Sequence, residues 1–108
     1  DCKVEDFCEM VKRLINIMGE DSIGIGSDLC MNWPDEVVMW MRNGKWTKKI
    51  DYGESKDKNA SWPKQPLWYS KPEDLPTLVD AMVSNGLNEK IAYKIGGINW
   101  LNFMSSHF

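Results

Sequence analysis

The chain has 108 residues, of which 43% are apolar and 27% charged, and its formal net charge at pH 7 is -3. This length allows one domain, and the composition is typical of a globular protein rather than a disordered one. The acidic balance argues against nucleic acid or an anionic membrane as the main partner, because both favour a basic surface. No apolar run is long enough to span a bilayer, so we expect no transmembrane segment.

The reactive side chains are few and scattered. Cys2, Cys8 and Cys30 are odd in number and irregularly spaced, which predicts buried or free thiols rather than a disulfide framework. The single histidine, His107, lies next to the end of the chain, where a functional residue is not expected. The sequence therefore supplies neither a complete zinc site nor a Ser-His-Asp triad.

Apolar residues recur at helical spacing at the start of the chain. They are Val4, Phe7, Cys8, Val11, Leu14, Ile15 and Met18. This pattern predicts an amphipathic helix over about residues 3–18, which Gly19 is expected to end. Glu20 and Asp21 follow in a turn, where we expect solvated carboxylates.

Residues 22–27 are the one clear strand candidate. Ile23 and Ile25 alternate with Gly24 and Gly26, so one face is β-branched and the other is nearly bare. A bare face is typical of a backbone that packs close to another group. A lone strand leaves its N–H and C=O groups without partners, and the sequence offers no second strand of comparable quality. We therefore expect this strand to pair with one from elsewhere.

A second helix is predicted over residues 35–42, with Pro34 before its first turn. Residues 45–71 then show no stable period and form a Trp-rich loop. Its aromatic residues are Trp46, Tyr52, Trp62, Trp68 and Tyr69. Such a loop either folds its aromatic side chains onto the body of the protein or forms an aromatic wall over a ligand site.

Three more helical stretches follow the loop. Ser70 is a candidate cap with Glu73 reaching back to it, although Pro76 indicates that regular helix begins only there. The first of these helices is expected to end at Asn85-Gly86.

Asn88 is expected to cap the next helix, which Gly96-Gly97 breaks before a last apolar helix. Asn99 lies within that apolar run. A buried asparagine has to be hydrogen-bonded, so we expect it to tie a helix end to a neighbouring backbone.

Asp28 ends the strand candidate and is the carboxylate of most interest. A carboxylate at the C-terminal end of a buried parallel strand is where α/β barrels place functional groups. The alternative is that the Asp28 side chain caps the next turn. The spacing favours neither interpretation over the other.

Three motifs, taken in order, resemble one family. Gly24-Ile25-Gly26-Ser27-Asp28 resembles a segment near the C-terminus of the membrane dipeptidase (renal dipeptidase-like) zinc metallopeptidases. A helix led by residues 72–76 precedes residues 88–95, which resemble the family's Ser-Glu-Glu-Ile-Ala-Lys-Ile helix. Residues 97–101 resemble its closing Gly-Gly-Asn-Trp/Phe-Leu-Arg. The resemblance covers residues 1–44 and 70–104, and residues 45–71 look like an insertion.

The resemblance implies an α/β fold, namely the C-terminal portion of a (β/α)₈ (TIM) barrel that is mostly helical with one barrel strand at about 22–27. Residues 1–108 would then be a single segment of a longer barrel domain, since such a barrel has about 250 residues. We accordingly expect the natural polypeptide to extend beyond Asp1.

The resemblance further implies dipeptide hydrolysis by a water that two zinc ions activate. The family's metal ligands come from earlier strands and are absent from this sequence, so we expect no zinc and no hydrolysis by this chain alone. Asp28 matches an aspartate that the resemblance implies to be both catalytic and substrate-binding. It would engage the free amine of the dipeptide or handle the proton passed to the leaving group.

Two departures from the family pattern affect the fine contacts. Residues 29–31 (Leu-Cys-Met) stand where the family often has Phe-Asp-Gly, which alters the substrate loop. Ile98 replaces a glycine and Asn102 replaces an arginine in the closing motif.

Two alternatives stand beside the dipeptidase hypothesis. One is a freestanding helical domain without catalysis that binds a partner or forms a homodimer through the unpaired strand at 22–27. The other is a small-ligand binder that uses the Trp-rich loop 45–71.

Overall fold

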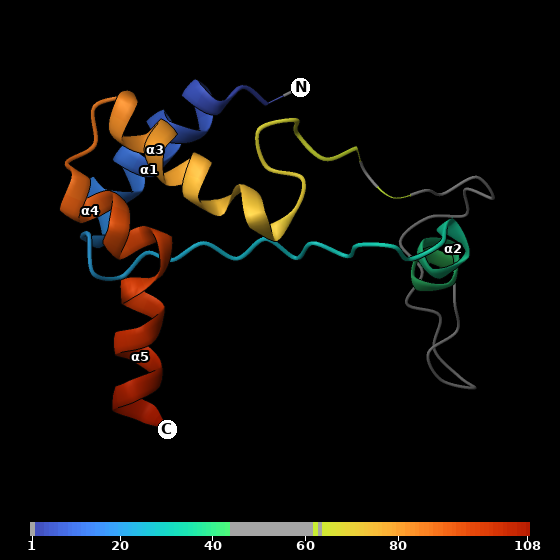
Figure 1. Ribbon diagram of the computed structural model, residues 1–108. Coiled ribbons are helices and arrows are strands. Elements are labelled where there is room, and N and C mark those ends of the chain that lie inside the picture. Colours follow the sequence, from blue (N-terminus) through green and yellow to red (C-terminus); the bar gives the residue numbers. More distant parts are fainter. Residues whose placement is uncertain (1, 44–61, 63) are drawn as a thin grey trace. The chain divides into compact units, whose positions relative to one another are not determined.

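The computed structural model describes residues 2–43, 62 and 64–108. The chain divides into two compact units, one made of residues 1–29 and 65–108 and the other of residues 30–64. Of the described helices, only α2 belongs to the second unit (Figure 1). The elements in chain order are α1 (Val4–Met18), α2 (Asp35–Asn43), η1 (Pro72–Asp74), α3 (Leu75–Ser84), α4 (Glu89–Tyr93), η2 (Lys94–Ile98) and α5 (Asn99–His107).

Residues 22–27 form no strand, so the predicted α/β barrel portion with a barrel strand is wrong. The residues that the structure describes are helical or without regular structure, and no strand is assigned among them. The segment instead runs as an extended stretch after α1 (Figure 1). A strand is defined by hydrogen bonds to a neighbouring strand, and the described part of the chain provides no strand to pair with.

The first helix agrees with the prediction. α1 spans Val4–Met18 and buries Cys8 and Val11, one turn apart on the same face. Gly19 ends the helix with a φ of 80° and donates its N–H to the Ile15 carbonyl at 2.9 Å. Glycine adopts this positive φ at little cost, which explains the position of the stop.

The first helical turn after the Trp-rich loop, η1, has Lys71 at its cap position, one residue later than the predicted cap Ser70. The carboxylate that accepts the free N–H groups belongs to Asp74, not to Glu73. It receives the backbone N–H of Ser70 at 2.9 Å and that of Lys71 at 3.1 Å. Asp74 is the last residue of the 3₁₀ turn η1, and α3 begins directly after it at Leu75. Pro76 lies in the first turn of α3, where the backbone N–H that proline lacks would have no partner within the helix.

The turn between α3 and α4 has the hydrogen bonds of a Schellman motif. Leu87 donates its N–H to the Met82 carbonyl at 3.0 Å, and Gly86 donates to Val83 at 2.9 Å. Gly86 has a φ of 93°, and Asn88 then caps α4 by accepting the Lys90 N–H at 2.9 Å. The predicted end at Asn85-Gly86 and the predicted cap at Asn88 are both confirmed.

The two glycines after α4 kink the helix rather than ending it. η2 joins α4 to α5, and the only non-helical backbone inside it is at Gly97. Gly96 lies against α3, since a Cβ on it would be 2.7 Å from Cγ2 of Val79. The missing side chain therefore lets α3 and the kink approach closely.

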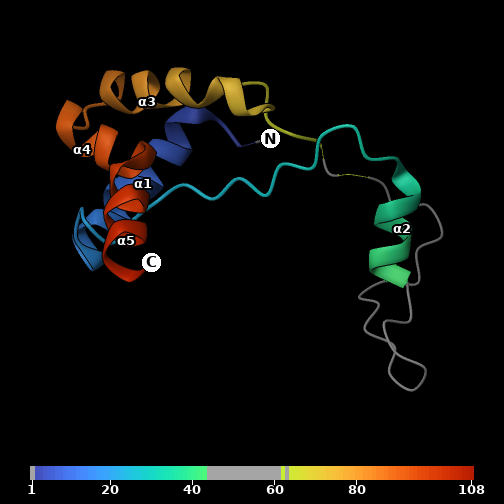
Figure 2. The same ribbon diagram turned by 60° about the horizontal axis from the view of Figure 1, so that its bottom comes forward.

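The core of the first unit lies where α1, α3 and the α4–α5 region meet. Figures 1 and 2 both show α3 beside α1. Ile23 of the extended stretch is part of this core. The other buried members are Cys8, Val11, Val79, Met82, Leu87, Ala92 and Ile95. Burying these apolar side chains is the main source of stability for the unit.

Two aromatic residues of the Trp-rich loop have structural contacts. Trp68 donates its indole N–H to the Cys2 carbonyl at 2.9 Å and lies 5.3 Å from the Phe7 ring, both within the first unit. Within the second unit, Trp62 donates its indole N–H to the Pro34 carbonyl, just before α2, at 3.2 Å. These contacts favour the interpretation in which the aromatic side chains fold onto the protein. Trp46 and Tyr52 lie outside the described residues.

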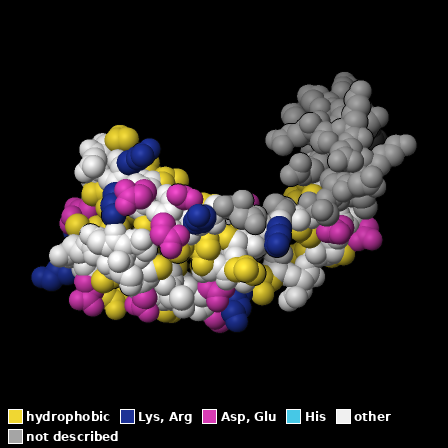
Figure 3. Space-filling model, turned by 90° about the horizontal axis from the view of Figure 1, so that it is seen from above, with side chains coloured by type: hydrophobic (Ala, Val, Ile, Leu, Met, Phe, Trp, Pro, Cys, Tyr) yellow, Lys and Arg dark blue, Asp and Glu magenta, His cyan; other side chains and the backbone are white. Residues whose placement is uncertain are grey.

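The surface is mixed in character. Acidic and basic side chains lie among apolar ones on the face seen in Figure 3. Among the described residues, none of the helices combines the length and the apolar character needed to cross a membrane.

Candidate functional site

Asn99 anchors the segment that connects α1 to Asp28. Its side-chain Nδ2 donates to the carbonyls of Glu20 at 2.7 Å and of Ile23 at 2.8 Å. The residue is 9% exposed, so both hydrogen bonds lie largely away from water. The predicted tie between a buried asparagine and a neighbouring backbone is thus confirmed. Residues 20–28 are called the anchored segment below.

Trp100 adds a second anchor on the next carbonyl of the same edge. Its indole N–H donates to the Ile25 carbonyl at 3.0 Å. A Cβ on Gly24 would lie 2.5 Å from the indole Nε1, so only glycine admits the ring at this distance. The glycine face of residues 22–27 had predicted that another group packs close to the backbone, and at Gly24 this prediction is confirmed. At Gly26, by contrast, a Cβ would meet nothing within 4 Å.

Lys94 supplies an ionic contact that the sequence analysis missed. Its ammonium lies 2.5 Å from the Glu20 carboxylate and 2.8 Å from that of Asp21. The two carboxylates remain exposed or half-exposed to solvent, as predicted, but they are also ion-paired, which was not predicted. The hydrogen bonds to Asp21 and Glu20 raise the pKa of the Lys94 ammonium.

Asp28 lies at the end of the anchored segment with an unusual backbone. Its φ is 48°, in the left-handed region that costs a non-glycine residue roughly 1 kcal/mol and that aspartate tolerates better than most. The residue is exposed, and its carboxylate has no hydrogen-bond or ion-pair partner among the residues described. The next turn uses a neighbour instead, since the Leu29 N–H donates to the Ser27 hydroxyl at 3.4 Å. The Asp28 side chain is therefore free to meet a ligand.

A cavity of about 410 Å³ borders the other end of the anchored segment. Asp21, Ser22, Ile23 and Gly24 form one wall, and Asn99, Trp100 and Phe103 form the other. Asp28 does not line it. The structure thus does not bring the cavity and the free carboxylate together into one site.

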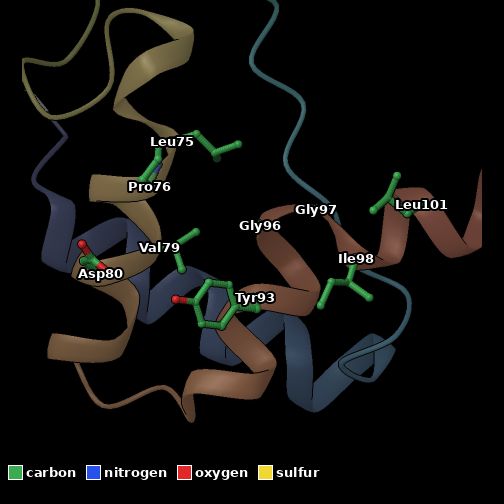
Figure 4. A pocket seen from close by; sticks show the side chains of 9 residues that line it. All are labelled: Leu75, Pro76, Val79, Asp80, Tyr93, Gly96, Gly97, Ile98 and Leu101. Carbon is green, nitrogen blue, oxygen red and sulfur yellow. The ribbon is translucent and has the colours of Figure 1, made fainter.

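A second cavity, of about 330 Å³, lies between α3 and the kink that joins α4 to α5 (Figure 4). Its lining is mainly apolar, with Asp80 as its one charged side chain. None of its lining residues belongs to the motif at residues 24–28. We therefore regard it as a packing feature of the α3 contact rather than as part of the Asp28 site.

The residues described hold no group of three or more His, Cys, Asp or Glu side chains that could bind a metal ion. His107, for example, places Nδ1 2.8 Å from the Phe103 carbonyl and stacks on the Phe103 ring. The thiol of Cys8 is buried in the core, and this burial raises its pKa, so it is a poor ligand. The zinc ions that the resemblance implies do not fit the described part of this chain.

The residues that sequence reasoning did not identify share one property. Lys94 and Trp100 reach the anchored segment from more than 70 positions away in the chain. Helical periodicity reports only neighbours within a turn or two, so it carries no signal for such partners. The bare position at Gly24 was the one local sign that a large group would lie there. Comparison of the chain with protein-family models, with curated protein sequences and with solved structures gives no match.

Proposed function

We propose that this chain is part of a dipeptide-hydrolysing metallopeptidase of the membrane dipeptidase type, in which Asp28 contacts the substrate. The observation that carries the proposal is the direct contact between two of the resembling motifs. Trp100 of the motif at 97–101 donates its indole N–H to the Ile25 carbonyl of the motif at 24–28, and Asn99 donates to the carbonyl of Ile23, the residue just before that motif. Two motifs of the same family resemblance thus contact each other in the folded chain, which supports considering them together.

The role of Asp28 follows from its position and its freedom. The anchored segment is held by two hydrogen bonds from Asn99, one buried and one partly buried, and by one from Trp100, and Asp28 lies at its end. A carboxylate that makes no contact of its own is available to attract the ammonium group of a dipeptide or to accept a proton. Strained backbone conformations occur at functional sites, and the φ of 48° at Asp28 agrees with such a role.

The proposal assigns no metal-binding role to this chain. Since its described residues offer no metal-ligand group, the ligands have to come from other residues of the complete protein. The contribution of this chain is confined to Asp28 and to the contacts that hold the anchored segment. We therefore expect the 108-residue chain by itself to leave dipeptides intact, even with zinc added.

The test uses the protein encoded by the complete reading frame that contains this sequence. We expect zinc-dependent hydrolysis of dipeptides, and we expect Asp28→Asn to lower kcat/KM about a hundredfold or more, as the loss of an acid–base group does. The zinc content should stay unchanged, because Asp28 is not a ligand.

The matched control is Asp80→Asn, which removes another exposed carboxylate, on α3. Its activity should equal that of the unchanged protein. A protein that hydrolyses no dipeptide would overturn the proposal. So would an Asp28→Asn variant as active as the Asp80→Asn control.

A further inference from the structure

The cavity between the anchored segment and the start of α5 has an unused hydrogen-bond acceptor in its lining. Asn99 is 9% exposed and lines this cavity of about 410 Å³. An amide nitrogen carries two hydrogens, and Asn99 donates them to the carbonyls of Glu20 and Ile23. Its Oδ1 accepts no hydrogen bond from the described residues. This oxygen keeps contact with solvent, since none of the buried side-chain oxygens in that part of the chain lacks a partner. The cavity is therefore where Oδ1 can meet a donor.

Two further acceptors lie beside Asn99 in the lining. Asp21 and Ser22 both border the cavity, and they stand between the two residues whose carbonyls Asn99 holds. One carboxylate oxygen of Asp21 accepts a hydrogen bond from Lys94 at 2.8 Å, and the other has no partner among the residues described. The Ser22 hydroxyl has no hydrogen-bond partner in the described part of the chain either. Three side chains thus offer oxygen atoms to a donor in the cavity.

The charge beside this cavity is negative. Glu20 and Asp21 carry one negative charge each, and the ammonium of Lys94 that contacts both neutralises one of them. Among the described residues, no lysine, arginine or histidine lines the cavity. The side-chain N–H groups of its lining belong to Asn99 and Trp100 and are donated to backbone carbonyls. An anion would meet a negative charge and no unused side-chain N–H, whereas a cation that donates hydrogen bonds finds matching partners.

Two aromatic rings complete the lining on the side of α5. Trp100 and Phe103 pack edge to face with their ring centroids 6.2 Å apart, and both remain partly exposed. Such rings bind a flat apolar group and also attract a nearby cation. The volume of the cavity lies in the range of small-molecule sites, so an aromatic ring with a short amine side chain fits.

We propose that this cavity binds a small organic ammonium ion, a primary amine joined to an aromatic body. The three N–H groups of the ammonium donate to Asn99 Oδ1, to the Asp21 carboxylate and to the Ser22 hydroxyl. The aromatic body lies against the rings of Trp100 and Phe103. The inference does not depend on the proposed function, because Asp28 does not line this cavity.

The first test is isothermal titration calorimetry of the 108-residue chain with 2-phenylethylammonium. We expect saturable binding with a dissociation constant of about 1 mM or lower. Three matched compounds each lack one feature. 2-Phenylethanol has no charge, phenylacetate has the opposite charge, and trimethyl(2-phenylethyl)ammonium keeps the charge but has no N–H to donate. Each should bind about tenfold more weakly or worse, because each loses the pairing with the three oxygens.

The second test removes the charge from the lining. Asp21→Asn keeps the size of the side chain and should raise the dissociation constant of 2-phenylethylammonium about tenfold or more. The matched control is Asp80→Asn, which removes the one charged side chain of the other cavity, between α3 and the kink. Its dissociation constant should equal that of the unchanged chain.

A third variant tests the aromatic side independently of Asp21. Phe103→Lys places a positive charge in the lining and should also weaken binding about tenfold or more. Phe108→Lys adds the same charge at a fully exposed residue outside the cavity and should not. If Asp21→Asn fails to fold by circular dichroism, Phe103→Lys decides.

Four results would overturn the inference. The first is a chain that shows no saturable binding of 2-phenylethylammonium. The second is equally tight binding of the alcohol or of the trimethylammonium compound. The third is binding that neither Asp21→Asn nor Phe103→Lys weakens. The fourth is binding that Asp80→Asn weakens as much as Asp21→Asn does, which would place the ligand in the other cavity.

Discussion

Trp100 donates its indole N–H to the Ile25 carbonyl at 3.0 Å, and it does so across the position where Gly24 lacks a side chain. The indole thus covers the bare position and holds the backbone at the same time. This single contact explains both the glycine at residue 24 and the tryptophan at residue 100. It links the stretch after α1 to the start of the last helix.

Gly24→Ala should destabilise the first unit by about 1–3 kcal/mol, because the new methyl group would overlap the indole of Trp100. Urea unfolding, followed by circular dichroism at a concentration where the chain is monomeric, measures this difference. Gly26→Ala is the matched control, since a Cβ there meets nothing within 4 Å. Its free energy of unfolding should change by less than about 0.5 kcal/mol. Equal effects of the two variants would contradict the close contact with Trp100.

Asn99→Ala should lower the free energy of unfolding by about 2–4 kcal/mol. The variant loses the hydrogen bonds to the carbonyls of Glu20 and Ile23 and leaves those carbonyls without their partner in a largely buried place. Asn102→Ala, on the exposed part of α5, serves as the control and should change stability little. An Asn99→Ala variant as stable as the control would show that the anchored segment is not held by this side chain.

The Lys94 ion pairs make stability sensitive to alkaline pH. The partners Asp21 and Glu20 raise the pKa of Lys94 above its ordinary value of about 10.5. The folded state therefore binds the Lys94 proton more tightly than the unfolded state does. The stabilisation by the ion pairs is complete below the ordinary pKa of lysine and is lost as the pH rises through the folded-state pKa.

Lys94→Met should accordingly flatten the decline in stability that sets in as the pH rises above about 10.5, the ordinary pKa of lysine. The control, Lys90→Met, removes an exposed ammonium from the same helical region and should decline as the unchanged protein does. Chemical denaturation across this range, at low salt, is the measurement. Parallel declines for all three proteins would rule out a stabilising role for the pairs.

Asp74 produces the opposite dependence, in acid. The backbone N–H of Ser70, with that of Lys71, lowers the pKa of the Asp74 carboxyl group. The stabilisation by the ionised Asp74 carboxylate is therefore complete above the ordinary pKa of an aspartate and is lost as the pH falls through the lower folded-state pKa. Asp74→Asn should remove this part of the acid dependence, whereas Glu73→Gln, one residue earlier, should leave it. A pH profile changed by Glu73→Gln instead would favour the cap that the sequence predicted.

The helices could be predicted from the sequence because their signals are local. The apolar period placed α1, and Gly19, Gly86 and Asn88 marked where helices end or begin through their own backbone or side-chain geometry. The carboxylate that caps the turn before α3 was predicted to be Glu73 and is Asp74. Both are acidic residues next to each other and close to the same N–H groups. Only the geometry of the turn decides between them.

The strand prediction failed for a different reason. Ile23 and Ile25 do turn toward the core, as the alternation predicted, and the backbone is extended. Strand pairing, however, depends on a second segment, which composition and alternation cannot supply. The same limit applies to the site. The free carboxylate of Asp28 could be singled out from its place after the strand candidate, but its distant neighbours could not.

The most direct test of the dipeptidase proposal is to determine the coding sequence upstream of Asp1 in the source genome. The proposal predicts an in-frame extension that carries an early His-x-Asp and later glutamate and histidine residues, which would supply the metal ligands that the described part of this chain lacks. A start codon immediately before Asp1 would contradict it. A protein that starts there would lack the metal ligands that the resemblance places on earlier strands.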